Sequence, residues 1–176
     1  LSGRLILPIA LISIGSYAFQ NCSFSGDLYL PEKLESIGER AFRLAGSFTN
    51  GLKIPDKIRK LNSWTFNGCM FKGKLELNNC EEFGNYCFEC GGCFSGELVI
   101  PEGVISIPDN CFGNCSFSKI IFPKSLRKIG ESGFFNNVHL EEIEFKEGLL
   151  SIESDAFSGC GNLLSLKLPS TLKNLQ

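Results

Sequence analysis

A segment of 22 to 24 residues recurs along the whole chain, and this repetition limits the fold more than any other feature. In its clearest copy, Leu28–Phe42, two leucines flank one residue, a proline follows, and an Ile-Gly pair precedes an Ala-Phe pair. The phenylalanine that closes each copy returns at Phe19, Phe42, Phe66, Phe88, Phe112, Phe134 and Phe157. One copy cannot bury its own apolar side chains, whereas stacked copies can, so the pattern predicts a repeat protein.

A pair of apolar residues flanking one variable residue opens each repeat, with the alternation of a half-buried strand. The eight pairs are Leu5/Leu7, Leu28/Leu30, Leu52/Ile54, Leu75/Leu77, Leu98/Ile100, Ile120/Phe122, Ile143/Phe145 and Leu166/Leu168. The phenylalanines fall in columns of the same register, and only Phe135 of the sixteen lies outside them. We therefore expect eight stacked parallel strands along one sheet, about 4.8 Å apart.

The repeat length and the leucine-x-leucine strands lie within the range of leucine-rich repeats. They predict a leucine-rich-repeat solenoid of the α/β horseshoe class, mostly β, right-handed and curved. Little regular helix is expected, because the connecting segments are too short for long helices. Leu1–Pro8 matches Phe24–Pro31, and the chain stops before the next Ala-Phe pair. We expect residues 1–176 to form a single array, a fragment of a longer protein that starts and ends in mid-repeat.

The charge and hydropathy of the chain exclude two classes of partner. Acidic and basic residues nearly balance, with a net charge of −2, and no basic run or stripe occurs. The sequence therefore lacks the electrostatic footprint of a protein that binds nucleic acid or an anionic membrane. No apolar run approaches the roughly 18 residues of a membrane-spanning helix. We expect neither nucleic-acid binding nor direct membrane insertion by this segment.

Nine cysteines raise the question of a metal site. The spacing of Cys80, Cys87, Cys90 and Cys93 suggests a zinc cluster, but the repeat register favours structural thiols. Cys80 stands in an aliphatic column and Cys87 in a column of small residues, whereas Cys90 and Cys93 belong to no column. Free buried cysteine behaves as a small apolar side chain. We therefore expect no metal bound by these four residues, with Cys80 and Cys87 in the core.

The repeat spacing also limits disulfides. A turn column holds Cys22, Cys69, Cys115 and Cys160. No two of these lie on neighbouring repeats, and two repeats span roughly 10 Å, beyond the limit of about 7 Å on the Cα separation in a disulfide. Cys87 and Cys111 do lie on neighbouring repeats, so a bridge between them remains open.

No arrangement of residues points to catalysis. His139 is the only histidine and lies in a turn column. No nucleophile motif and no phosphate-binding glycine loop occur. An active site needs titratable groups that converge in a pocket, and the sequence offers no such group. We expect no catalytic residue, no cofactor and no enzymatic activity.

The unit L-x-L-P-x-x-L-x-x-I-G-x-x-A-F-x-x-C-x-x-L, clearest at Leu28–Phe42, Leu98–Cys115 and Ile143–Cys160, resembles the BspA-like class of leucine-rich repeats. The variants FSGDLYLP, FKGKLEL and FSGELVIP resemble the form expanded in parasitic protists. Members of this class are commonly surface proteins linked to adhesion to host cells or matrix. The resemblance implies an adhesive cell-surface or secreted protein that binds host or matrix proteins.

The expected function is a non-enzymatic protein–protein interaction module with an open sheet face. Its candidate contact residues lie between the apolar pairs: Tyr29, Lys53, Glu76, Val99, Ile121 and Glu144. Mixed charge with some apolar members suits a protein partner. One alternative is an intracellular structural or scaffold protein that uses the same surface, which the abundant thiols favour. Another places the contact site around Trp64 and Tyr86.

Overall fold

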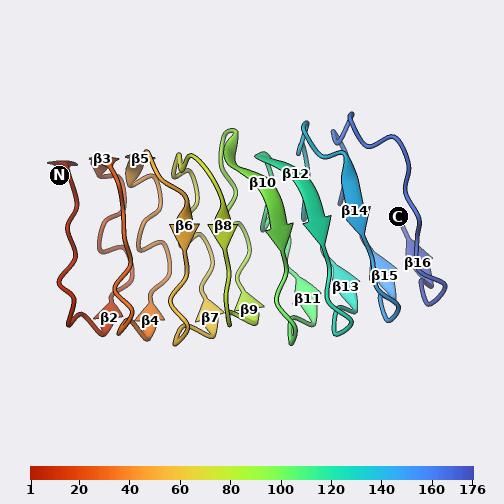
Figure 1. Ribbon diagram of the computed structural model, residues 1–176, viewed down its shortest axis with the longest axis horizontal. Helices are drawn as coiled ribbons and strands as arrows, with labels where there is room; N and C mark the ends of the chain where they lie inside the picture. Colours follow the sequence, from red (N-terminus) through yellow and green to blue (C-terminus); the bar gives the residue numbers. More distant parts are fainter.

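The computed structural model describes residues 1–176 and contains sixteen short β-strands and no helix. The chain winds into a parallel β-solenoid of about eight turns, here called rungs, which stack along one axis with the termini at opposite ends (Figure 1). Each rung follows one repeat of the sequence, because stacking is what buries the apolar columns. The expected solenoid of stacked parallel strands, without long helices, is confirmed.

The most regular ladder comes from the two residues that end in the isoleucine of the Ile-Gly pair. Its strands are β2 (Ser13–Ile14), β4 (Ser36–Ile37), β7 (Lys60–Leu61), β9 (Glu82–Phe83), β11 (Ser106–Ile107), β13 (Lys128–Ile129), β15 (Ser151–Ile152) and β16 (Asn174–Leu175). They lie along the lower edge of Figure 1 and pair in parallel as β2-β4, β7-β9 and β11-β13-β15-β16. In most of them the first residue faces solvent and the apolar second residue is buried.

A second set of strands lies across the rung from this ladder. It comprises β1 (Ser2–Gly3), β3 (Ser23–Gly26), β5 (Gly46–Phe48), β6 (Leu52–Lys53), β8 (Leu75–Glu76), β10 (Cys93–Val99), β12 (Cys115–Ile121) and β14 (Glu142–Glu144). These strands form three separate parallel sheets, β1-β3-β5, β6-β8 and β10-β12-β14.

The distribution of strands differs from the expectation in one respect. The sequence predicts one continuous sheet of leucine-x-leucine pairs. In the structure only the first residue of a pair lies in a strand, and only in five rungs, those of β6, β8, β10, β12 and β14. The pairs Leu5/Leu7, Leu28/Leu30 and Leu166/Leu168 are not part of a strand, and the sheet is interrupted between β8 and β10. At Leu28 a polar side chain, described below, replaces the backbone pairing.

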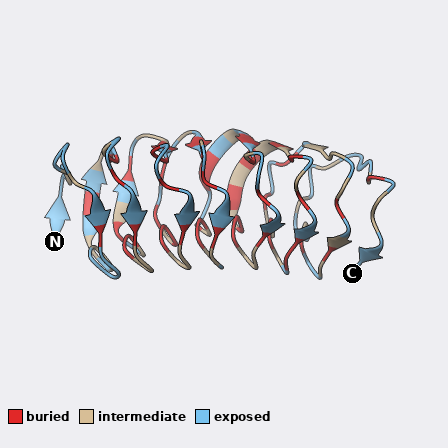
Figure 2. Cartoon of the chain, turned by 90° about the horizontal axis from the view of Figure 1, so that it is seen from below, coloured by how far each residue is buried: buried red, intermediate tan, exposed pale blue.

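Two files of phenylalanine rings fill the interior of the solenoid. In the first file the centroids of neighbouring rings, from Phe42 through Phe66, Phe88, Phe112 and Phe134 to Phe157, lie 5.2 to 5.7 Å apart. The second file runs from Phe48 to Phe117, with rings stacked across each rung boundary. Buried residues line the inside of the rungs between the two ends, as Figure 2 shows, and merge into a single apolar core. The predicted aromatic columns are therefore core residues.

Close contact between rungs explains the glycine of the Ile-Gly pair. A Cβ atom at Gly38 would lie 2.3 Å from the backbone nitrogen of Ser16, and one at Gly84 would lie 2.2 Å from that of Ser63. No side chain fits at such distances, so glycine is required where two rungs touch through their backbones.

The cysteines divide into core thiols and one disulfide. Cys80 and Cys87 are fully buried, as expected, and burial raises the pKa of the Cys80 thiol to about 12. Cys87 and Cys111 are both free, so the bridge left open between them is not formed. Cys90 and Cys93 are joined by a disulfide, which the sequence analysis did not predict.

Candidate interaction surface

The six candidate residues follow one outward-facing column on the leucine-x-leucine side of the solenoid. Strand register places Lys53 opposite Glu76, Val99 opposite Ile121, and Ile121 opposite Glu144. They face outward because their apolar neighbours in each pair face the core and successive strand side chains alternate. The strand register thus aligns two groups of the candidates, Lys53 with Glu76, and Val99 with Ile121 and Glu144.

Exposure differs along this column. The side chain of Tyr29 is 68% exposed, and that of Val99 is 50% exposed. Ile121 and Glu144 are half-buried. An aromatic residue this exposed is a candidate anchor for a partner, since interfaces draw most of their energy from a few large side chains. The structure therefore favours the N-terminal half of the column.

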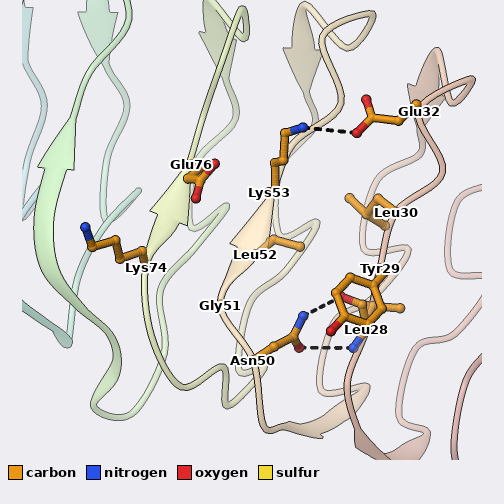
Figure 3. Close-up of a pocket in the computed structure, with 10 residues that line it drawn as sticks. All are labelled: Leu28, Tyr29, Leu30, Glu32, Asn50, Gly51, Leu52, Lys53, Lys74 and Glu76. Atoms are coloured by element: carbon orange, nitrogen blue, oxygen red, sulfur yellow. Dashed lines mark hydrogen bonds and ion pairs between the residues drawn. The ribbon is translucent and has the colours of Figure 1, made fainter.

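The side chain of Asn50 interrupts the backbone ladder beside Tyr29. Its Nδ2 donates a hydrogen bond to the carbonyl of Leu28 at 2.9 Å, and its Oδ1 accepts one from the Leu28 amide at 3.1 Å (Figure 3). The amide side chain thereby satisfies the two groups that would otherwise pair with the next strand. Buried backbone groups need such partners. Leu28 and β6 are consequently not paired as strands.

A hollow opens on the sheet face at this interruption. It has a volume of about 460 Å³ and is lined by Leu28, Tyr29, Leu30, Glu32, Asn50, Gly51, Leu52, Lys53, Lys74 and Glu76. Figure 3 shows these residues on three successive stretches of chain, with Tyr29 at one side and Glu76 at the other. Three of the six candidate residues, Tyr29, Lys53 and Glu76, belong to its lining.

The charges around the hollow are only partly neutralised. The Nζ of Lys53 lies 3.0 Å from the Oε1 of Glu32, and this hydrogen bond raises the pKa of Lys53. Lys74 and Glu76 form no ion pair within 4 Å and are both exposed. One free cation and one free anion therefore stand at the hollow, which suits a partner that presents polar groups of both signs.

The C-terminal half of the column is more internally engaged. Lys119 and Glu142, on the flanking positions of β12 and β14, form an ion pair at 2.9 Å. Glu144 is paired with Lys146, and this hydrogen bond lowers the pKa of Glu144. A partner that contacts this half must compete with these pairs, although exposed pairs contribute little energy.

The alternative surface around Trp64 and Tyr86 is a stack of rings and guanidinium groups. The ring centroids of Trp64 and Tyr86 lie 4.0 Å apart and nearly parallel. Arg40 lies between the rings of Tyr17 and Trp64, 5.7 and 5.8 Å from their centroids. These side chains contact one another through ring stacking and cation–π interactions. Less of each aromatic ring face is therefore free to contact a partner.

The hollow was not among the features expected from the sequence. The signal was present: Asn50 occupies the position held by Gly26, Gly73 and Gly96 in the Phe-x-Gly segments of other repeats. Glycine there allows the ordinary turn into the strand, whereas asparagine supplies a side chain that can cap a neighbouring backbone.

The chain belongs to the BspA type leucine-rich repeat family. The family model, described as a BspA type leucine-rich repeat region with six copies, matches residues 3–95 and 81–176. Together these two matches cover nearly the whole sequence. Repeats of this family indicate a protein-interaction module. No curated protein matches the chain. The structure contains no helix that is long and apolar enough to span a bilayer.

Two solved structures are similar to this chain. A leucine-rich repeat protein from Bacteroides ovatus is 19% identical, with a TM-score of 0.50 over 93% of this chain and 54% of its own. A leucine-rich cell surface protein from Faecalibacterium prausnitzii is 18% identical, with a TM-score of 0.47 over 94% of this chain and 59% of its own. The chain thus spans just over half the length of these proteins. Identities this low bear on the fold alone.

Proposed function

We propose that the chain is a non-enzymatic protein-binding module whose partner contacts the open sheet face around Tyr29. The observation that carries this proposal is the exposed tyrosine beside a hollow with an unpaired Lys74 and Glu76. An aromatic anchor next to a polar recess is the arrangement that gives an interface both energy and orientation. The amide and carbonyl of Leu28 at the recess are already hydrogen-bonded to Asn50, so side chains have the larger part in determining which partner fits.

The partner in this proposal is a host-cell or matrix protein, and the protein acts as an adhesive molecule at the cell surface or after secretion. Membership in the BspA type repeat family supports an interaction role. The resemblance of the Phe-x-Gly repeats to adhesive surface proteins supports the location. The remaining expected contacts, Lys53, Glu76, Val99, Ile121 and Glu144, extend the same surface along the column.

An intracellular scaffold that uses the same surface is the second candidate. Seven of the nine cysteines are free, and five of these seven are buried. Free thiols persist most readily in a reducing compartment. Antibody labelling of intact and permeabilised cells separates the two: labelling of intact cells supports the adhesive protein, and labelling only after permeabilisation supports the scaffold.

The contact site is tested with beads coated with residues 1–176 and applied to a monolayer of epithelial cells. We expect Tyr29→Ala to reduce the number of attached beads at least about fivefold, since loss of an anchor costs 1 kcal/mol or more. The matched control is Tyr17→Ala, because Tyr17 is also an exposed tyrosine, at 50%, but lies in the ring stack. Equal attachment of the Tyr29→Ala protein and the parent contradicts the proposed site. A loss confined to Tyr17→Ala moves the site to the ring stack.

A further inference from the structure

Three cysteine sulfurs from two neighbouring rungs meet beside the turn that leads into β10. Cys90 and Cys93 are joined across this turn. Cys115, the first residue of β12, lies opposite Cys93 in the strand register, and its Sγ is 3.5 Å from that of Cys90. The three Sγ atoms all lie within 4.8 Å of one another.

This cluster is not explained by the repeat. Where Cys90 stands, other rungs carry Asn21, Asn114 or Gly159, which all adopt a left-handed φ. Cys93 precedes Phe94, whereas the residues that precede the matching phenylalanine in other rungs are Ser23, Ser47, Met70 and Ser116. Two sulfurs are therefore added to the rung at the point where its neighbour already presents the thiol of Cys115. The sequence separation of 22 residues or more conceals this proximity, which rung stacking creates.

We propose that reduction of the Cys90–Cys93 disulfide converts this cluster into a binding site for one thiophilic metal ion, held by Cys90, Cys93 and Cys115. Thiolates bound to zinc at about 2.3 Å stand roughly 3.8 Å apart in tetrahedral geometry. The Sγ atoms of Cys90 and Cys115 already lie 3.5 Å apart, so once the disulfide is broken only the sulfurs of Cys90 and Cys93 have to separate. Sulfur is the only ligand type present in the group, and soft thiolate ligands select zinc, cadmium and monovalent copper over harder ions.

The surroundings of the cluster favour a dehydrated ion with three protein ligands. Cys90, Cys93 and Cys115 are 4%, 2% and 1% exposed. The backbone carbonyls of Phe88 and Gly113 lie 3.5 and 3.6 Å from the Sγ of Cys115. A fourth thiol or an imidazole does not join the group. The cation supplies the positive charge that allows buried thiols to ionise, because metal binding displaces their protons.

The redox step is balanced by a dithiol reductant. Two electrons and two protons from the reductant break the Cys90–Cys93 bond and give two thiols, while the reductant forms its own disulfide. The ion then binds the three sulfurs and releases their protons to solvent. In the oxidised protein two of the three sulfurs are bonded to each other, so the same site cannot bind the ion. Metal occupancy thus depends on the redox state of this turn.

Cadmium serves as the probe, because its bond to thiolate sulfur gives an ultraviolet charge-transfer band. Reduced protein, freed of reductant without oxygen, is titrated with cadmium chloride. We expect one equivalent bound per chain by the reduced protein and no binding by the oxidised protein. Cadmium bound equally by both forms, or by neither, overturns the proposal.

Two alanine variants locate the site. The columns of Cys115 and Cys111 contain Ala45 and Ala41 respectively, so alanine fits the fold at both positions. We expect Cys115→Ala to weaken cadmium binding at least about tenfold, as loss of a ligand exceeds the effect of an outer-shell change. Cys111→Ala, which removes a buried thiol outside the cluster, leaves binding unchanged. If Cys111→Ala loses cadmium binding, or if Cys115→Ala keeps its full binding, the ion is bound by other thiols and the proposal is overturned.

Discussion

The side-chain amide of Asn50 forms both of the hydrogen bonds that the backbone of Leu28 offers to the next rung. Its oxygen accepts from the Leu28 amide at 3.1 Å, and its nitrogen donates to the Leu28 carbonyl at 2.9 Å. One side chain therefore replaces a strand pairing at Leu28 and lines the recess beside Tyr29. The proposed contact site lies where this backbone pairing is replaced.

The first prediction concerns this replacement. Asn50→Ala leaves the amide and carbonyl of Leu28, a residue only 1% exposed, without partners. We expect a loss of about 1–3 kcal/mol in the free energy of unfolding, the cost of unsatisfied buried backbone groups. Urea unfolding measures it. Asn79→Ala is the control, because Asn79 is exposed and makes one long hydrogen bond of 3.4 Å. Similar losses in the two variants would show that Asn50 does not support the ladder.

The second prediction compares a core ring with a surface side chain of the middle rungs. Phe112 is fully buried, and its ring centroid lies 5.4 Å from that of Phe88 and 5.3 Å from that of Phe134. Phe112→Ala should cost about 3–5 kcal/mol because it leaves a cavity in the file. Val99→Ala, at a half-exposed position, should change the stability by less than about 1 kcal/mol. Chemical denaturation of both variants decides, and equal losses would contradict the assigned register.

The third prediction uses two glycines of the same column. Gly84→Ala places a Cβ atom 2.2 Å from the backbone nitrogen of Ser63, whereas nothing lies within 4 Å of a Cβ at Gly15. We expect Gly84→Ala to lose about 1–3 kcal/mol or to fail to fold, through overpacking between rungs. Gly15→Ala should be neutral or slightly stabilising, because alanine restricts the unfolded chain. Thermal unfolding of both proteins is the measurement. A stable Gly84→Ala protein would show that the rungs can move apart at no cost.

The fourth prediction concerns acid. Glu147 accepts hydrogen bonds from the amide and hydroxyl of Ser170 and from the amide of Thr171, and these lower the pKa of Glu147 below its ordinary value. A lowered pKa in the folded state stabilises the fold above the unfolded value of about 4.3, and this contribution is lost as the pH falls through the folded value.

We therefore expect amide hydrogen exchange at Ser170 and Thr171 to accelerate, relative to its intrinsic rate, as the pH falls from 6 to 3. In Glu147→Gln the extra acceleration should disappear, because the neutral amide does not titrate. Exchange measured by nuclear magnetic resonance tests this. The same acid dependence in both proteins would assign the effect to another carboxylate.

Periodicity alone determined the architecture of this protein. The columns of Leu, Ile and Phe can be buried only by stacking, so the number of rungs, the parallel direction and the core positions of Phe42, Phe88 and Phe112 follow from their spacing. The outward direction of Tyr29 and Val99 follows from the alternation of strand side chains. These features depend on what every repeat has in common.

Features that depend on one particular pair of neighbouring rungs could be identified only from the tertiary structure. At the recess beside Tyr29 the side chain of Asn50 contacts the backbone of Leu28, and in the sulfur cluster Cys115 lies beside Cys90 and Cys93. In each case a residue differs from the others in its repeat column. The sequence shows this difference, but it does not show which atom of the neighbouring rung the residue will contact. Those contacts depend on the distance between two particular rungs, a quantity that only the folded chain defines.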